Sequence, residues 1–130
     1  MIGVILCRRW IYSNFFRVRP NQSYERNQIM RMLMIVSMPH HKFNAAVKDG
    51  TVGAKIGKIM DAQKPEAAYF TELHGQRTGI LVVNLTDASQ IPAFAEPWFL
   101  TFEADVQLRP AMLPADLQRS GIDTIGKQWS

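Results

Sequence analysis

The chain has 130 residues, 47% of them hydrophobic, which is enough for one domain with a core and too short for two. Its net charge of +4 comes from residues 1–31, which hold six of the 15 basic and one of the 11 acidic residues, so the rest is slightly acidic. A single cysteine, Cys7, excludes an intrachain disulfide, and the apolar run 1–7 is far shorter than the roughly 20 residues of a membrane span. We expect a cytoplasmic protein with no membrane anchor.

The first 30 residues lack a sustained helix or strand period. Their mixture of arginines and aromatic residues is compatible with contact to RNA or a membrane surface, but a disordered extension or a start codon placed too early is the simpler interpretation. Met30, Met32 and Met34 are alternative starts. The working domain is therefore predicted to span residues 31–130.

Four segments of that domain have strand periodicity. The strands are expected at residues 32–38, 67–73, 78–85 and 104–109. The first and third are apolar at both alternating positions, which predicts burial on both faces, whereas the second and fourth alternate as half-exposed strands do. Gly75 lies in the short turn that joins the second and third strands into a hairpin.

Helical periodicity separates these strands. The first helical region, residues 40–63, breaks at Gly50, after which Thr51 is placed to cap its second part. A second helix is expected to begin after Asp87 or Ser89 and to kink or end at Pro97. A short helical segment, interrupted at Gly121, is expected within residues 112–129.

This element order predicts an α+β domain of the ferredoxin-like, split βαβ class: a four-stranded antiparallel sheet with two helices on one face. Its first and third strands would be central, in agreement with their apolar character. Because the helices cover one face only, the apolar residues on the other face need another cover. The simplest cover is a second copy, so we expect a homodimer through the open sheet face.

Three stretches carry a resemblance to a known superfamily: Asp49-Gly50-Thr51-Val52-Gly53, Lys64-Pro65-Glu66-Ala67-Ala68-Tyr69-Phe70-Thr71, and Ile91-Pro92-Ala93-Phe94-Ala95-Glu96-Pro97-Trp98-Phe99. Through these stretches, residues 31–130 resemble the dimeric α/β-barrel superfamily. Within it they look like a small, uncharacterised bacterial branch that is distantly similar to muconolactone isomerases. The superfamily includes isomerases, cofactor-free monooxygenases and haem-degrading proteins, so the resemblance implies a dimeric α/β barrel and no single activity.

Candidate site residues come from three places in the pattern. His40, where the first strand meets the first helix, is a candidate catalytic base, against the alternative of a polar helix terminus. Tyr69 and Glu72, in the hairpin with Arg77, are candidate substrate-binding residues, although such a carboxylate and guanidinium more often form a surface ion pair.

The third place is the proline-containing second helix. Trp98 and Phe99 are candidate substrate-binding residues, and Glu96, if desolvated against Trp98, is a candidate catalytic acid or base. The alternative is that the aromatic residues belong to the core and Glu96 faces solvent.

No metal or cofactor site is expected, since no His/Asp/Glu pattern supplies the three ligands of a metal site and no phosphate-binding glycine loop follows a strand. Nucleic-acid binding by the domain is disfavoured because the third strand lacks stacking aromatics. Two functions stay open: a homodimer that binds an apolar or aromatic small molecule, as an isomerase or cofactor-free monooxygenase does, and a non-catalytic accessory or interaction dimer.

Overall fold

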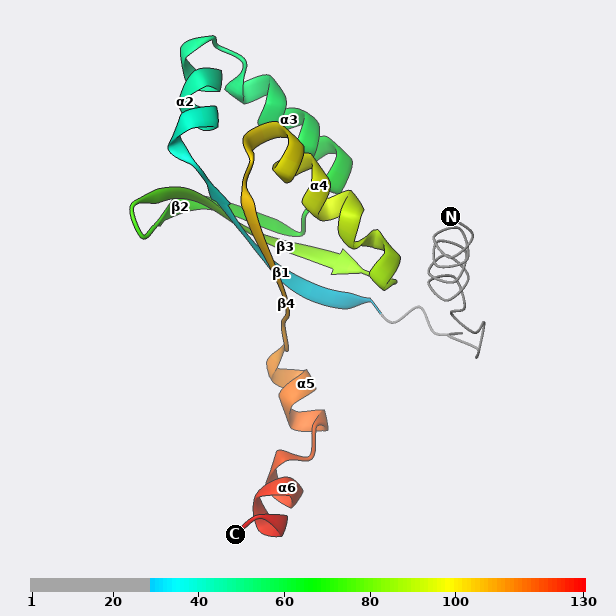
Figure 1. Ribbon diagram of the computed structural model, residues 1–130. Helices are drawn as coiled ribbons and strands as arrows, with labels where there is room; N and C mark the ends of the chain where they lie inside the picture. The colour runs from blue at the N-terminus through cyan, green and yellow to red at the C-terminus, as the bar shows by residue number, and fades with distance from the viewer. Residues whose placement is uncertain (1–28) are drawn as a thin grey trace, which may run out of the picture.

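The computed structural model describes residues 29–130, which form an α+β arrangement around one four-stranded sheet (Figure 1). The elements follow the chain in this order: β1 (Met30–Met38), α2 (His40–Lys48), α3 (Val52–Gln63), β2 (Ala67–Leu73), β3 (Gln76–Leu85), a 3-10 turn η1 (Ala88–Gln90), α4 (Ile91–Phe102), β4 (Asp105–Pro110), α5 (Pro114–Arg119) and α6 (Ile122–Gln128). No helix within these residues is long and apolar enough to cross a bilayer.

The sheet is antiparallel throughout, with strand order β2-β3-β1-β4. The two strands predicted to be apolar on both faces, β1 and β3, are the central pair, and the two alternating strands are the edges. Met34 lies opposite Leu81 on one side and Leu108 on the other, so these three side chains share one face of the sheet.

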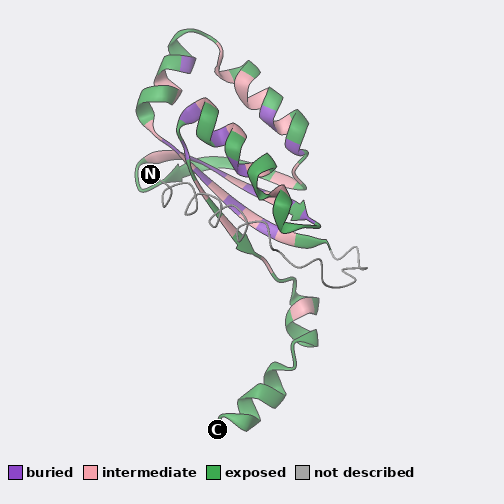
Figure 2. Cartoon of the chain, turned by 45° about the vertical axis from the view of Figure 1, so that its right-hand side comes forward, coloured by how far each residue is buried: buried purple, intermediate pink, exposed green. Residues whose placement is uncertain are grey.

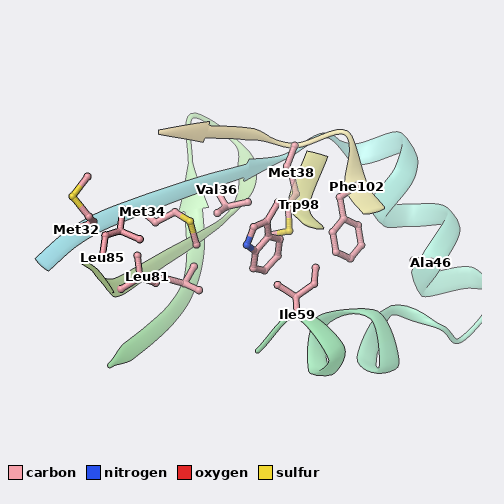
Figure 3. Close-up of a cluster of buried hydrophobic side chains, with 12 residues drawn as sticks. Met32, Met34, Val36, Met38, Ala46, Ile59, Leu81, Leu85, Trp98 and Phe102 are labelled. Carbon is pink, nitrogen blue, oxygen red and sulfur yellow. The ribbon is translucent and has the colours of Figure 1, made fainter. Parts of the chain in front are cut away.

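The core lies between this face and a layer formed by α2, α3 and α4. Every second residue of β1, from Met32 to Met38, is buried here, beside Leu81 and Val83 of β3. Trp98 and Phe102 of α4 fill the centre, and Ile59 of α3 closes it from the helical side (Figure 3). Burial of these aromatic and aliphatic side chains away from water stabilises the domain.

The opposite face of the sheet carries the other alternating set. Leu33 and Ile35 of β1 and Ile80 and Val82 of β3 form a half-buried apolar stripe at its centre. The helical layer lies wholly on the other side (Figures 1 and 2), so none of the described helices covers this stripe. We call this surface the open face.

Glycine conformations at the predicted breaks are confirmed. Gly50 ends α2 with φ +79°, and Gly75 has φ +76° in the β2–β3 turn. Thr51 precedes α3, as predicted, but its hydroxyl donates to Asp49 Oδ1 at 2.6 Å instead of capping α3. Asp87, in contrast, caps η1 by accepting from the Ser89 backbone N–H at 2.7 Å.

The sequence predicted that Pro97 either ends or kinks the second helix. The helix does not end there, because α4 continues to Phe102. A proline in a helix leaves the carbonyl four residues earlier without its N–H partner. Here the Gln63 side chain supplies donors from α3: its Nε2 lies 3.4 Å from the Ala93 carbonyl oxygen and 2.7 Å from that of Phe94. This outside donor compensates for the missing bond within α4.

Beyond β4, α5 and α6 extend away from the sheet and the helical layer as an arm (Figures 1 and 2). Gly121 separates them with φ +72°, where the sequence predicted an interruption. The tail predicted before the domain falls almost entirely on residues 1–28, outside the described part of the chain.

Candidate functional site

Trp98, predicted to line a pocket, is completely buried in the core. Its ring packs beside Phe102, with centroids 6.2 Å apart, and its Nε1 donates to Gln63 Oε1 at 3.1 Å. The indole N–H is thus satisfied inside the protein, and Gln63 holds both this group and the Pro97 region of α4. The helix–sheet interior at this point is filled with side chains.

The other candidate residues lie at three separate places: the start of α2, the outer surface of α4 and the β2–β3 hairpin. Glu96 is exposed and Phe99 is partly exposed on α4, and His40 is exposed at the first position of α2. Tyr69 points to the open face, because it pairs with Ile80 in the register, and so lies on the opposite side of the sheet from Trp98. The structure does not bring Tyr69 together with the α4 residues.

Glu72 and Arg77 occupy directly opposed positions in the β2–β3 hairpin. Their side chains have other partners: Glu72 Oε2 accepts from the Gly75 backbone N–H at 3.0 Å, while Arg77 donates to Asn44 Oδ1 at 2.7 Å. The guanidinium carbon of Arg77 also lies 4.5 Å from the centre of the Phe43 ring, a cation–π distance. Arg77 therefore fastens α2 to the hairpin.

A groove of about 690 Å³ lies on the helical layer, where α2, α3 and α4 meet. Its lining consists of Lys42, Ala45, Lys55, Lys58, Ile59, Ala62, Pro97, Leu100 and Thr101. The floor is apolar, and three ammonium groups come from two different helices. Leu100 is 81% exposed at the edge of the groove.

The sequence builds this groove by helical spacing and small residues. Lys55, Lys58, Ile59 and Ala62 follow one another at i, i+3, i+4 and i+7, so they form one stripe along α3. The short side chains of Ala62 and of Ala45 on α2 leave the hollow that larger residues would fill. Pro97 and Leu100 complete it from α4.

The groove is positively charged. Lys42 Nζ lies 3.7 Å from Glu103 Oε1, so this carboxylate offsets part of the positive charge that Lys42 brings to the groove. At the start of α3, hydrogen bonds from Thr51 lower the pKa of the Asp49 carboxyl, and the charge of Lys55 contributes a smaller lowering. Lys58 adds a third cation to the rim, which makes the groove suited to an anion with an apolar body.

The lining offers lysines and one threonine as its reactive groups, without a carboxylate or imidazole. Among residues 29–130 no group of three His, Cys, Asp or Glu side chains is placed to hold a metal ion. In this arrangement an apolar surface lies beside ammonium groups that can attract an anion.

The groove lysines were not predicted as site residues. The signal was present in the i, i+3 spacing of Lys55 and Lys58 beside Ile59, but such spacing is also what any solvated helix face shows. Only the approach of α2 and α4 turns that stripe into a concave surface.

No known protein family, curated protein or solved structure shows significant similarity to the chain.

Proposed function

We propose that this protein is a homodimer of ferredoxin-like domains, of the dimeric α/β-barrel type, that binds a small amphipathic anion in the groove between α2, α3 and α4. The observation that carries the binding proposal is the combination of an apolar floor around Ile59, Pro97 and Leu100 with the ammonium groups of Lys55 and Lys58 at its rim. The ligand class is a carboxylate with an aliphatic or aromatic body.

The fold and dimer parts of the proposal rest on the sheet. Strand order β2-β3-β1-β4 with all three packed helices on one side supports a ferredoxin-like assignment. The apolar stripe of Leu33, Ile35 and Ile80 on the open face supports a second copy as its cover, because a stripe of this kind in water favours association.

The dimensions of the groove agree with a small ligand. Pockets for small molecules occupy roughly 300–1,000 Å³ and combine apolar walls with a few polar groups. The groove, at about 690 Å³, has room for a medium-chain or aromatic carboxylate. Binding without reaction is the simplest function, because the lining lacks a carboxylate or imidazole to move a proton.

Calorimetric titration of the full chain with decanoate tests the binding proposal. We expect saturable binding, and we expect Lys58→Glu to weaken it by about tenfold, because a repulsive charge replaces an attractive one at the rim. Lys48→Glu is the matched control: it makes the same charge change at the exposed end of α2, outside the groove, and should leave the affinity unchanged.

Two further measurements separate groove binding from nonspecific association. Ala62→Trp should fill the hollow and abolish binding, and 1-decanol, which has the same chain without the charge, should bind more weakly than decanoate. Equal binding by wild type, Lys58→Glu and Ala62→Trp would contradict the proposal.

A non-catalytic accessory dimer is the second candidate function. The filled interior favours it, since Trp98 and Gln63 occupy the space between sheet and helices and satisfy each other's polar groups. Native mass spectrometry of the full chain purified without added ligand distinguishes the two: a dimer with a retained small mass supports the binding function, and an empty dimer that ignores decanoate supports the accessory function.

A further inference from the structure

The groove on the helical layer has two distinct ends, because α3 and α4 run along it in opposite directions (Figure 1). At the end of α3, the Gln63 side chain reaches the Ala93 and Phe94 carbonyl oxygens near the start of α4. At the end of α4, Phe102 stacks on Phe43 of α2, with the ring centroids 5.4 Å apart. The last turn of α4 therefore lies beside α2, and the last turn of α3 lies at the other end of the groove.

The end of the groove nearest α2 holds its polar groups. Lys42 belongs to the first turn of α2, and Thr101 directly precedes Phe102 in the last turn of α4. Lys55 belongs to the first half of α3, which lies at this end of the groove. Lys58 follows one turn later, and the Cα–Cβ bond of a helical residue tilts toward the helix N-terminus, here toward Lys55. Ammonium groups and a hydroxyl, all of which donate to a carboxylate, therefore gather at this end.

The other end of the groove is apolar. Ala62 follows Lys55 by two turns of α3, so their Cα atoms are about 10 Å apart along the helix axis. Pro97 lies one turn before Thr101 on α4, and the buried Ile59 lines the groove between the two ends. A ligand with one charge at the end of an apolar chain matches this arrangement. A second charge at the far end of that chain would lie beside Ala62 and Pro97, where its desolvation is not compensated.

A carboxylate of the protein itself already lies at the charged end. Glu103 Oε1 is 3.7 Å from Lys42 Nζ. The backbone fixes its position, because Glu103 is the C-cap of α4 and its N–H donates to the Phe99 carbonyl oxygen at 2.9 Å. The side chains of Lys42 and Glu103 are 46% and 68% exposed, and an ion pair so open to water is weak. A ligand carboxylate can therefore take the place of Glu103 on Lys42 at small cost.

We infer that the groove has a direction: it takes a monocarboxylate with the charged end between Lys42 and Lys55 and the chain toward Ala62, and Glu103 is the internal carboxylate that this ligand displaces. The inference rests on the proposed binding function. It adds to that function the orientation of the ligand, the preference for a single charge and an internal competitor.

Calorimetric titration of the full chain with decanoate tests the competitor. We expect Glu103→Gln to lower the Kd by about threefold, because the ligand no longer competes with the Glu103 carboxylate for Lys42. Asp123→Asn is the matched control. It also removes one exposed carboxylate, on α6 in the arm that points away from the helical layer, and should leave the Kd unchanged.

Lys42→Gln distinguishes displacement from a general gain of positive charge. We expect this variant to raise the Kd by about threefold, because the ligand loses one ammonium group. If Glu103 and the ligand compete for Lys42, Glu103→Gln has no further effect on the Kd in the Lys42→Gln background. An equal gain in affinity from Glu103→Gln in both backgrounds would overturn the competitor.

Decanedioate, which has the same chain with a second carboxylate at its far end, tests the direction. We expect the wild type to bind it about tenfold more weakly than decanoate, and we expect Ala62→Lys to remove most of this difference by giving the second carboxylate a partner. Ala54→Lys, the same change at an exposed position of α3 outside the groove lining, should keep the difference. Tighter binding of decanoate by Ala62→Lys would place the carboxylate at the Ala62 end and overturn the direction.

The outcomes separate this inference from the proposed function. Suppose that decanoate binds and Lys58→Glu weakens it, but Glu103→Gln leaves the Kd unchanged and decanedioate binds equally well. The direction and the competitor would then be overturned, and the groove would remain the binding site. A wild-type chain that does not bind decanoate would overturn both.

Discussion

Gln63 connects two features of α4 through one side-chain amide. Its oxygen accepts from the indole N–H of the buried Trp98. Its nitrogen donates to the Phe94 carbonyl and lies 3.4 Å from the Ala93 carbonyl, which Pro97 leaves without its helical donor. A buried polar residue in this position serves the packing of α4 against α3 because both ends of the amide are used.

Replacing Gln63 tests this role at the residue scale. We expect Gln63→Leu to lower the free energy of unfolding by about 2 kcal/mol, because the Trp98 indole N–H is left buried without a partner and the Ala93 and Phe94 carbonyls lose a donor. Urea unfolding followed by circular dichroism measures it. Asp61→Leu, at an exposed position of the same helix, should change stability by less than about 0.5 kcal/mol, and an equal loss in both variants would contradict the assigned role.

At the scale of elements, the ends of the helices depend on backbone conformations that glycine adopts most easily. Gly50 follows the C-cap of α2 at φ +79°, and Lys64 is the C-cap of α3 at φ +44° although it carries a side chain. The left-handed region is costly for any residue with a Cβ atom. A glycine is therefore expected to stabilise the protein at position 64, and loss of the glycine is expected to destabilise it at position 50.

We expect Lys64→Gly to raise the free energy of unfolding by about 0.5–1 kcal/mol and Gly50→Ala to lower it by about 1 kcal/mol. No other atom lies within 4 Å of a Cβ built at Gly50, so backbone strain alone is tested there. Gly53→Ala is the control: it lies inside α3 in equally open space, and its substitution should stabilise the helix. Destabilisation by both glycine variants would argue against the strain explanation.

At the scale of the whole molecule, the two faces of the sheet differ in what covers them. One is buried under three helices and filled by Trp98 and Phe102, and the other presents the stripe around Ile35 and Ile80. The groove on the outer helical surface lies away from the open face, so the proposed ligand binding and the proposed dimerisation would use separate surfaces and could be disrupted independently.

Ile80→Lys tests the open-face dimer. Ile80 pairs with Ile35 and with Tyr69, so a charge there would lie at the centre of the interface, and we expect the dimer Kd to rise by about a hundredfold or more while the domain stays folded. Sedimentation equilibrium measures the change. Val47→Lys, at an exposed position of α2, is the matched control and should leave the Kd unchanged; an intact dimer in Ile80→Lys would place the interface elsewhere.

Much of the architecture could be predicted from the sequence. Alternation in 67–73 and the doubly apolar runs around Ile35 and Leu81 indicated edge and central strands, because side-chain period within a strand is a local property. Gly50 and Gly75 marked breaks for the same reason, since the conformation that favours glycine depends on a few consecutive residues.

The site could not be predicted in this way. Residues of 42–62 and 97–101 form the groove only because three helices pack side by side. The buried indole N–H of Trp98 finds its acceptor, Gln63 Oε1, 35 residues away on α3. Local periodicity determined which elements form and which face of each is apolar. The tertiary structure alone decided which surfaces meet and which side chains line a concave surface. It also decided which apolar residues, such as Leu100 and Trp129, stay in solvent. All three outcomes depend on contacts between residues that are distant in the chain.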